Sequence, residues 1–575
     1  MLALKARRNP SRYQLIHPWP GRRPGILFRA LILASLLPKE EMDRFWKLLL
    51  STSKANLGKE KVFMDPFMGS GTSLVESLSL GLRVIGVDVN TVAWFIAKKV
   101  IEPIDVNKLK RSINQVIRKV KPLINTLYVT RDPIDGRKVT AKAYFWIKSI
   151  RCERCKVEVR LFKNYKLARR NGKVWIYCPF CNSVSLVDDR NKLICPVCGT
   201  ELRPISVKQS YVCPRCGYKG RILRSVILSG MPTMSIFAVM YNTNDGIKIK
   251  VADDFDFMIY HKAENMIKEI NYFLNVRLRF GEETKRLIKY GYVHVKDLFN
   301  ARQLLVIYTL RNIITGLDQS TKELLALTLS KTATFFSILT PYTYKMNKPE
   351  SMFMLHQYMH EKMYMEINPL ESIRGSFVTN ARRLIDAKRY TNRVIGTNIK
   401  VVHNFESFKN GADVLLLRTS TLNLHEIPDD YVDLVTTDPP HFGNVIYSGI
   451  ADFYYAIISP ILKDKYPEFK NKNSCDEDDE IVYDVLRRKD EKFYERMLTM
   501  SLREVRRVLK PTGKLVLTFR HKDEGVWELI YSSMKKAGFR IIREWPLECE
   551  GNIQPQARNV KAKESAIVCI PYDAS

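Results

Sequence analysis

Hydrophobic and polar positions near the N-terminus alternate as they do where strands lead into helices. Residues 61–65 form a short apolar run, residues 73–80 have helical periodicity, and residues 83–88 form a second apolar run. Gly81 stands where the helix should end, because glycine readily adopts the conformation that closes a helix. The pattern predicts a strand–helix–strand unit of the kind that builds doubly wound α/β sheets.

The same alternation resumes after about residue 410. It predicts strands at residues 413–418, 432–437 and 514–520, helices at residues 493–509 and 526–537, and a terminal hairpin from residues 539–545 and 565–571. Because two strands alone are not stable, the chain should return here to the sheet begun near the N-terminus.

The middle of the chain breaks this pattern. Residues 106–260 are rich in Lys and Arg and contain short strand-like runs, such as residues 174–177, whereas residues 261–400 are mostly helical by periodicity. The clearest helix there covers residues 304–314. We therefore expect one α/β domain, formed by residues 1–105 and 401–575, with a two-part insertion between its halves.

Charge and hydropathy limit the partners of the chain. Among 575 residues, Lys and Arg number 93 against 60 Asp and Glu, a formal net charge of +33 that favours a polyanionic partner such as nucleic acid. No stretch has the ~20 uncharged apolar residues of a membrane helix. The apolar run at residues 26–37 contains Arg29 and lacks a cleavage site, so it predicts an amphipathic helix in a cytoplasmic protein. The acidic residues 475–480 predict a solvated loop.

Eight of the 11 cysteines form four Cys-x-x-Cys pairs, a spacing that indicates metal binding in a cytoplasmic chain. The pairs are Cys152/Cys155, Cys178/Cys181, Cys195/Cys198 and Cys213/Cys216. Two thiolates at this spacing can face one tetrahedral Zn²⁺, so we predict two structural zinc sites, one from the first two pairs and one from the last two. The zinc ions could serve only to fold the insertion, or the ribbons could also contact nucleic acid. Cys475, Cys549 and Cys569 stand alone and are expected to be buried.

The first predicted strand ends in a glycine-rich octapeptide. Asp65-Pro66-Phe67-Met68-Gly69-Ser70-Gly71-Thr72 opens the following helix, and glycines in such a turn let the backbone approach a ligand at the helix N-terminus. Asp88 ends the next strand, where a carboxylate is well placed to bind ribose hydroxyls. These features predict a nucleotide-like cofactor at this turn.

The octapeptide resembles the S-adenosyl-L-methionine-binding motif of DNA amino-methyltransferases. His17-Pro18-Trp19-Pro20 looks like the HPxxxP element of that family, and Asp438-Pro439-Pro440-His441-Phe442 looks like its catalytic DPPY motif. Residues 507–519 are similar to the helix, turn and strand that follow in these enzymes. Together with the Cys-x-x-Cys pairs, the resemblance points to the zinc-ribbon-containing adenine-specific DNA methylases of archaea and bacteria.

The resemblance implies a Rossmann-like class I methyltransferase sheet interrupted by a zinc-ribbon and helical insertion. It also implies S-adenosyl-L-methionine as cofactor, adenine N6 of DNA as target, and target recognition by the insertion. The residues expected to hold the cofactor are His17, Pro18, Asp65, Pro66, Phe67, Gly69, Ser70, Gly71, Thr72, Asp88 and, more weakly, Ser420.

An exocyclic amine is a poor nucleophile, because its lone pair is delocalised into the base. The Asp438 carboxylate and the Pro439 carbonyl could accept both of its N–H groups and aim the nitrogen at the methyl donor. His441, which replaces the usual tyrosine, or Phe442 should then stack on the flipped base. Three alternatives stay open: cytosine N4 as the target, an RNA methyltransferase, and a zinc-containing binding protein that has lost activity.

Overall fold

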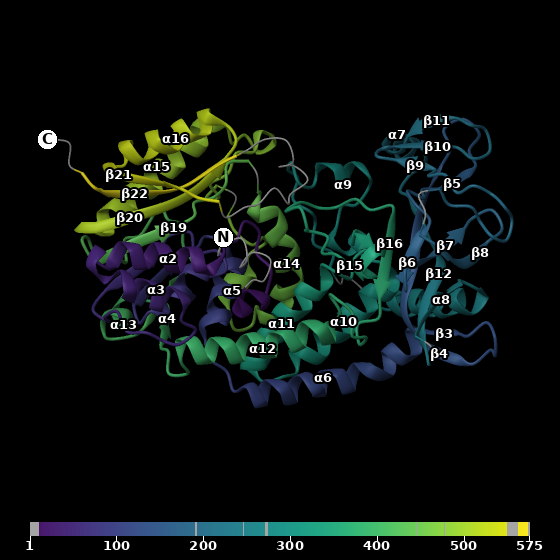
Figure 1. The fold of residues 1–575 in the computed structure, drawn as a ribbon, viewed down its shortest axis with the longest axis horizontal. Coiled ribbons are helices and arrows are strands. Elements are labelled where there is room, and N and C mark those ends of the chain that lie inside the picture. The colour runs from purple at the N-terminus through teal and green to yellow at the C-terminus, as the bar shows by residue number, and fades with distance from the viewer. Residues whose placement is uncertain are drawn as a thin grey trace. The chain divides into compact units, whose positions relative to one another are not determined.

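The structure, a computed structural model, describes residues 11–189, 192–244, 246–270, 274–443, 445–476, 478–548 and 562–572. The chain divides into two compact units (Figure 1). Unit 1 combines Met1–Lys110 with Arg383–Ser575, and unit 2 is Arg111–Arg382. Along the sequence, each boundary between the units falls within a helix: the first within α6 (Val106–Leu127) and the second within α12 (Phe377–Ile395).

Unit 1 contains an eight-stranded sheet with the order β17-β18-β2-β1-β19-β20-β22-β21. The strands are β1 (Val62–Asp65), β2 (Arg83–Val87), β17 (Val401–Val402), β18 (Val414–Leu417), β19 (Val432–Thr437), β20 (Leu509–His521), β21 (Phe539–Pro546) and β22 (Lys563–Pro571). Neighbouring strands from β17 to β20 are parallel, and β22 runs antiparallel to both β20 and β21. From β1 the chain first adds strands on one side of the sheet (β2, β17 and β18) and then on the other (β19 and β20). Ligands in such sheets bind at this switch point, so they are expected at the carboxyl ends of β1 and β19.

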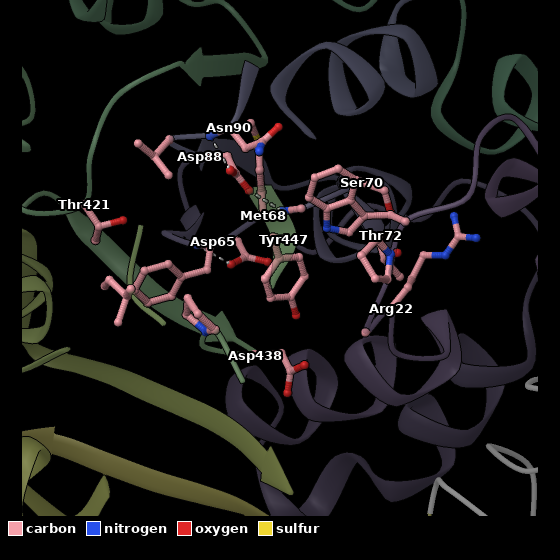
Figure 2. Close-up of a pocket in the computed structure, with 18 of the residues that line it drawn as sticks. Arg22, Asp65, Met68, Ser70, Thr72, Asp88, Asn90, Thr421, Asp438 and Tyr447 are labelled. Carbon is pink, nitrogen blue, oxygen red and sulfur yellow. Dashed lines mark hydrogen bonds between the residues drawn. The ribbon is translucent and has the colours of Figure 1, made fainter. Parts of the chain in front are cut away.

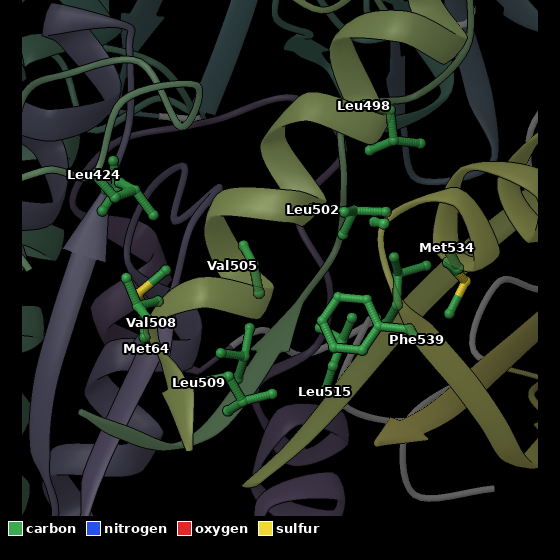
Figure 3. Packing of buried hydrophobic residues seen from close by; sticks show 14 of the residues in the cluster. Met64, Leu424, Leu498, Leu502, Val505, Val508, Leu509, Leu515, Met534 and Phe539 are labelled. Carbon is green, nitrogen blue, oxygen red and sulfur yellow. The ribbon is translucent and has the colours of Figure 1, made fainter. Parts of the chain in front are cut away.

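Most of the helices of unit 1 pack on this sheet. The helices are α2 (Gly25–Leu36), α3 (Met42–Leu50), α4 (Thr72–Ser79), α5 (Thr91–Ile101), α13 (Phe405–Lys409), α14 (Tyr447–Leu462), α15 (Glu491–Val508) and α16 (Glu524–Lys536). Leu498, Leu502 and Val505 of α15 recur at helical spacing and reach the buried cluster around Leu515 of β20 (Figure 3). The α15 helix is therefore fixed by one apolar face, while its other face is solvated.

The predicted strands and helices of unit 1 are confirmed to within a few residues, including the return of the chain to the first sheet. The terminal strands pair antiparallel as predicted, but β22 also inserts between β20 and β21, which the sequence pattern did not predict. Helix α2 is more buried than an amphipathic helix would be. Its Arg29 is only 5% exposed, and its guanidinium donates to Glu76 at 3.2 Å and to the Leu48 carbonyl at 2.8 Å.

Unit 2 is built on a sheet with the order β13-β12-β4-β16. The segment between β4 and β12 in the sequence forms two further, small three-stranded sheets. The strands of the main sheet are β4 (Lys138–Arg151), β12 (Thr233–Thr243), β13 (Gly246–Val251) and β16 (Met363–Ile367), and β3 (Val129–Arg131) and β5 (Glu158–Arg160) pair with β4. The helices are α7 (Ile222–Ser229), α8 (Asp254–Lys268), α9 (Lys285–Lys289), α10 (Ala301–Thr315) and α11 (Gln319–Ala333). Strand β16 of the predicted helical segment thus shares a sheet with strands of the predicted zinc-ribbon segment.

A polar network occupies the core of unit 2. Glu366 and Arg302 are fully buried, and the guanidinium donates to both carboxylate oxygens, at 2.7 and 2.9 Å. Tyr128, Trp146 and Asn300 donate to the same carboxylate at 2.8–2.9 Å. Because each charge is paired and hydrogen-bonded, the network can persist without water.

In the part of the chain that the structure describes, no helix combines the length and hydropathy needed to cross a membrane.

Candidate active site and metal centres

Asp65 ties together the three elements that meet at the cofactor motif. Its carboxylate accepts hydrogen bonds from the Phe67 N–H at 3.0 Å, from the Thr437 hydroxyl at 2.7 Å and from the Ser73 hydroxyl. These donors come from the turn, from the end of β19 and from α4. Burial raises the pKa of Asp65 to about 6 despite these bonds. Asp65 therefore organises the turn.

The glycines of the turn allow a close approach of backbone. Gly69 has φ +49°, and a Cβ added there would lie 2.9 Å from Nε1 of Trp19. Gly71 has φ +75° at the N-cap of α4, and a Cβ there would lie 3.0 Å from that of Ala97. A side chain at either position would be strained and would displace its neighbour.

Asp88 closes the turn from the end of the next strand. Its two carboxylate oxygens accept the Gly69 N–H at 2.9 Å and the Asn90 N–H at 2.8 Å. Burial raises the pKa of Asp88 to about 7. The carboxylate lines the cleft beside the turn, where each oxygen can accept one further hydrogen bond.

A cleft of about 940 Å³, part of it open to solvent, lies over the carboxyl ends of β1 and β19 (Figure 2). Predicted cofactor residues that line it are Asp65, Phe67, Gly69, Ser70, Thr72, Asp88 and Ser420, and predicted catalytic residues that line it are Asp438 and Pro440. The lining does not include His17, Pro18, Pro66, Gly71, Pro439, His441 or Phe442. The cofactor and DPP motifs, far apart in the sequence, are thus brought to one cleft.

The HPWP segment contributes through its later residues. His17 is buried, with Nδ1 2.8 Å from the Pro18 carbonyl and its ring edge-on to Tyr454 at 4.5 Å between centroids. Trp19 and the residues that follow it up to Arg23 line the cleft instead. The segment therefore covers the glycine turn through Trp19, but the residues that line the cleft are Trp19 to Arg23 and not the predicted His17 and Pro18.

Asp438 is held by side chains that sequence reasoning missed. Its Oδ1 accepts the Thr518 hydroxyl at 2.7 Å and the Arg23 Nε–H at 3.0 Å, and its Oδ2 lies 3.5 Å from His441 Nε2. Arg23 also pairs with Glu564 at 2.6 Å. The Asp438 side chain is only 12% exposed, so these donors fix the carboxylate in one orientation at the edge of the cleft.

His441 and Phe442 do not offer a free ring face to the cleft. Phe442 is 8% exposed and stacks on Tyr483, with 4.6 Å between ring centroids. His441 is 9% exposed and lies under the backbone of Gly21, where an added Cβ would be 3.2 Å from the imidazole. The structure therefore does not place Phe442 where a base could stack, because burial in the apolar core is favourable for its ring.

The acidic segment predicted to be a solvated loop contributes to the cleft. Cys475, Asp479 and Glu480 are among its lining residues, and Glu480 is only 5% exposed. The Glu480 carboxylate accepts the Ser448 N–H at 2.8 Å and the Ser448 hydroxyl at 2.6 Å, so it fixes the start of α14. The prediction of a solvated loop is wrong for these residues. Cys475 and Cys569 are buried as predicted, and Cys549 lies outside the described residues.

The eight paired cysteines form two tetrads within unit 2. Tetrad A is Cys152, Cys155, Cys213 and Cys216, and tetrad B is Cys178, Cys181, Cys195 and Cys198. The predicted pairing in sequence order is therefore wrong, since tetrad B lies between the two halves of tetrad A along the chain. Strands β7 (Lys173–Cys178) and β8 (Ser183–Asp188) form a hairpin around the Cys178/Cys181 knuckle, and the next knuckle along the chain, Cys195/Cys198, completes tetrad B.

The geometry of both tetrads fits Zn²⁺. Sulfur atoms of paired knuckles lie 3.6–3.8 Å apart, and Zn–S bonds of ~2.3 Å in a tetrahedron require about 3.8 Å. Residues Lys156, Asn182, Gly199 and Gly217, one after each pair, all have positive φ. The N–H groups of Lys156, Gly199 and Gly217 turn back to the carbonyl of the first cysteine of their pair, as tight metal-binding turns do.

The chain is similar to two type II methyltransferases. It is 34% identical to M.MvaI of Kocuria varians over 104 residues, which are 18% of this chain and 22% of that protein. It is 35% identical to M.MjaII of Methanocaldococcus jannaschii over 66 residues, which are 12% of each chain. The chain thus spans less than a quarter of the length of either relative.

No family model matches the chain. Among solved structures, the [4+2]-cyclase SpnF aligns with 29% of this chain and 60% of its own, at 12% identity and a TM-score of 0.15. A likeness this weak carries no argument about fold or activity.

Proposed function

We propose that this protein is an S-adenosyl-L-methionine-dependent methyltransferase that methylates an exocyclic amino group in DNA, with adenine N6 as the target. One observation carries the proposal: the glycine turn after β1 and the Asp438-Pro439-Pro440 segment after β19 line or adjoin a single cleft. Parallel neighbouring strands bring both motifs to the same edge of the sheet, where ligands bind in doubly wound folds. The similarity to two type II methyltransferases supports the same activity.

The cleft suits a cationic cofactor. Its lining includes five carboxylates against two guanidiniums, an acidic excess in a chain with a net charge of +33. The carboxylates are those of Asp65, Asp88, Asp438, Asp479 and Glu480, and the guanidiniums are those of Arg22 and of Arg23, which pairs with Asp438. S-adenosyl-L-methionine supplies an electrophilic methyl group on a positively charged sulfur, and it also carries an ammonium group. Asp88, whose Oδ2 accepts the Gly69 N–H, would hold it beside the glycine turn, and the N-terminus of α4 would favour the carboxylate end of the same molecule.

Asp438 has the position and the partners of a hydrogen-bond acceptor for the target amine. Thr518 and Arg23 both donate to Oδ1. These two hydrogen bonds fix the orientation of the carboxylate before the substrate binds. Hydrogen bonds from the two amine N–H groups to Asp438 and to the adjacent Pro439 carbonyl would direct the nitrogen lone pair toward the methyl donor. Transfer then depends on positioning, and no separate base is needed before the carbon–nitrogen bond forms.

DNA binding is assigned to unit 2. Residues 151–230 contain 17 Lys and Arg against 5 Asp and Glu, and the two cysteine tetrads lie in this segment. Such a surplus favours phosphate contacts, which release condensed counterions and make affinity depend steeply on salt.

The test is methyl transfer from tritiated S-adenosyl-L-methionine to duplex DNA, to total tRNA, or to no nucleic acid, followed by nucleoside analysis. We expect label in N6-methyladenine from DNA. Label in N4-methylcytosine would change the base, and label in tRNA would change the substrate. Asp438→Ala should abolish transfer while cofactor binding remains, whereas Asp464→Ala, at an exposed carboxylate, should have no effect. No transfer to any nucleic acid would contradict the proposal.

A further inference from the structure

An aromatic residue outside the DPPHF segment lies in the cleft. Tyr447, the first residue of α14, lines the cleft, and in Figure 2 its ring is drawn between Asp65 and Asp438. Burial and the nearby Asp438 carboxylate raise the pKa of Tyr447, and Asp88 acts in the same direction. The ring therefore stands close to both the catalytic and the cofactor motif, and its hydroxyl stays neutral.

Trp19 supports the Tyr447 ring from the N-terminal segment. The two rings are stacked, with centroids 5.9 Å apart and planes inclined by 23°. Trp19 in turn lies against Gly69, whose missing side chain makes room for it. Gly21, with φ +69°, lets the backbone pass the Tyr447 hydroxyl, because a Cβ there would lie 2.6 Å from that oxygen. Both rings are only partly exposed, and both line the cleft.

The start of α14 is rigid, so the Tyr447 ring is held in advance of substrate binding. The Glu480 carboxylate accepts the backbone N–H and the hydroxyl of Ser448, the residue after Tyr447. Arg487, whose side chain is 2% exposed, donates to the same hydroxyl at 2.9 Å. A side chain fixed in this way loses little conformational entropy when a ligand packs on it.

We propose that Tyr447, supported by Trp19, provides the ring on which the flipped target base stacks, in place of the residues that follow Asp438-Pro439-Pro440. This inference rests on the proposed function and names the positioning residue for its substrate. Phe442 is committed to the core, and His441 is buried outside the cleft lining, whereas the partly exposed Tyr447 ring lines the cleft near the amine acceptor. A base drawn from a duplex loses its stacking there, and a tyrosine face restores part of it.

The experiment compares single-turnover methyl transfer by wild type, Tyr447→Ala, Tyr447→Phe and Tyr447→Leu, with native and heat-denatured unmethylated genomic DNA. Tyr447→Ala should lose about 5- to 150-fold with native DNA, the range for one base stacked on one aromatic ring. The loss should be smaller with denatured DNA, where fewer bases must leave a duplex. Tyr447→Phe should lose far less than Tyr447→Leu, which keeps apolar volume without a ring face.

Calorimetry with S-adenosyl-L-methionine and thermal melting separate this role from others. Cofactor affinity should change much less than transfer, and Trp46→Ala, which removes a half-exposed ring on α3, should change neither. Equal transfer by Tyr447→Ala and wild type would overturn the stacking role, as would equal losses in the Phe and Leu variants or a matching loss of cofactor affinity. If wild type itself transfers no methyl group, the proposed function has failed, a result distinct from these.

Discussion

Removal of Arg23 is the most informative perturbation of the candidate active site. The Arg23 side chain is 1% exposed and joins two carboxylates, Asp438 at 3.0 Å and Glu564 at 2.6 Å. These carboxylates are 12% and 4% exposed, so Arg23→Ala would leave both without this cation in poorly solvated surroundings. Breaking a buried pair by removal of one partner costs about 3–5 kcal/mol. We expect the melting temperature to fall by roughly 10 °C, since ~1 kcal/mol corresponds to a few degrees in a domain of this size.

Arg22→Ala is the matched control, because it removes the neighbouring guanidinium without breaking a carboxylate pair. Arg22 donates to the His17 carbonyl at 3.2 Å, and loss of one such bond costs about 1 kcal/mol. Adding Glu564→Gln to Arg23→Ala should restore part of the lost stability, because it removes one of the uncompensated charges. Scanning calorimetry measures the melting temperature of each variant. Labelled methyl transfer measures its activity, which should fall if Asp438 loses its orientation. If Arg23→Ala melts no lower than Arg22→Ala, the pair does not contribute as the geometry indicates.

Three further predictions concern ionisation, metal and the core of unit 2. The pKa of Asp88, raised by burial to about 7 from an unfolded value of about 3.9, means that its contribution to stability is present at low pH and is lost as pH rises through 7. The melting temperature of wild type should therefore fall more between pH 5 and 8 than that of Asp88→Asn; equal slopes would count against this assignment. The double variant Cys152→Ser, Cys213→Ser should retain one zinc per chain by metal analysis, because both cysteines belong to tetrad A; pairing in sequence order would damage both sites. Glu366→Ala should destabilise unit 2 by about 3–5 kcal/mol in denaturant unfolding, since it strands buried Arg302; a change under ~1 kcal/mol would contradict the network.

Features that depend on residues close together in the sequence were predictable. The strand ending at Asp65, the turn through Gly69 and the helix that follows are local, and each has its own composition and periodicity. The Cys-x-x-Cys spacing likewise predicts knuckles, because two thiolates three residues apart can share one ion. The pairing between knuckles is not local. It depends on the β7–β8 hairpin. The sequence pattern predicts the first strand, at residues 174–177, but not the strand with which it pairs.

Contacts between distant segments were the ones that sequence reasoning missed. Arg23 and Asp438 are 415 positions apart, and nothing in the pattern around either residue marks the other as its partner. The acidic run that ends at Glu480 predicts a solvated loop, whereas a buried acid needs partners to offset its charge. The partners of Glu480, the first turn of α14 and Arg487, become neighbours only after the chain has folded.

The direction of a side chain within a correctly located motif is a further limit. The sequence placed Asp438 to Phe442 at the carboxyl end of a strand, and the structure agrees, yet only Asp438 and Pro440 of these five residues line the cleft. Burying a phenylalanine ring contributes about 1.5–3 kcal/mol, so an apolar space beside the motif competes with the cleft for Phe442. Tyr483, Tyr494 and His521 provide that space. With Phe442 buried there, the proposed stacking of a base needs an aromatic face from another element, and Tyr447 at the start of α14, which lines the cleft, has the position to supply it.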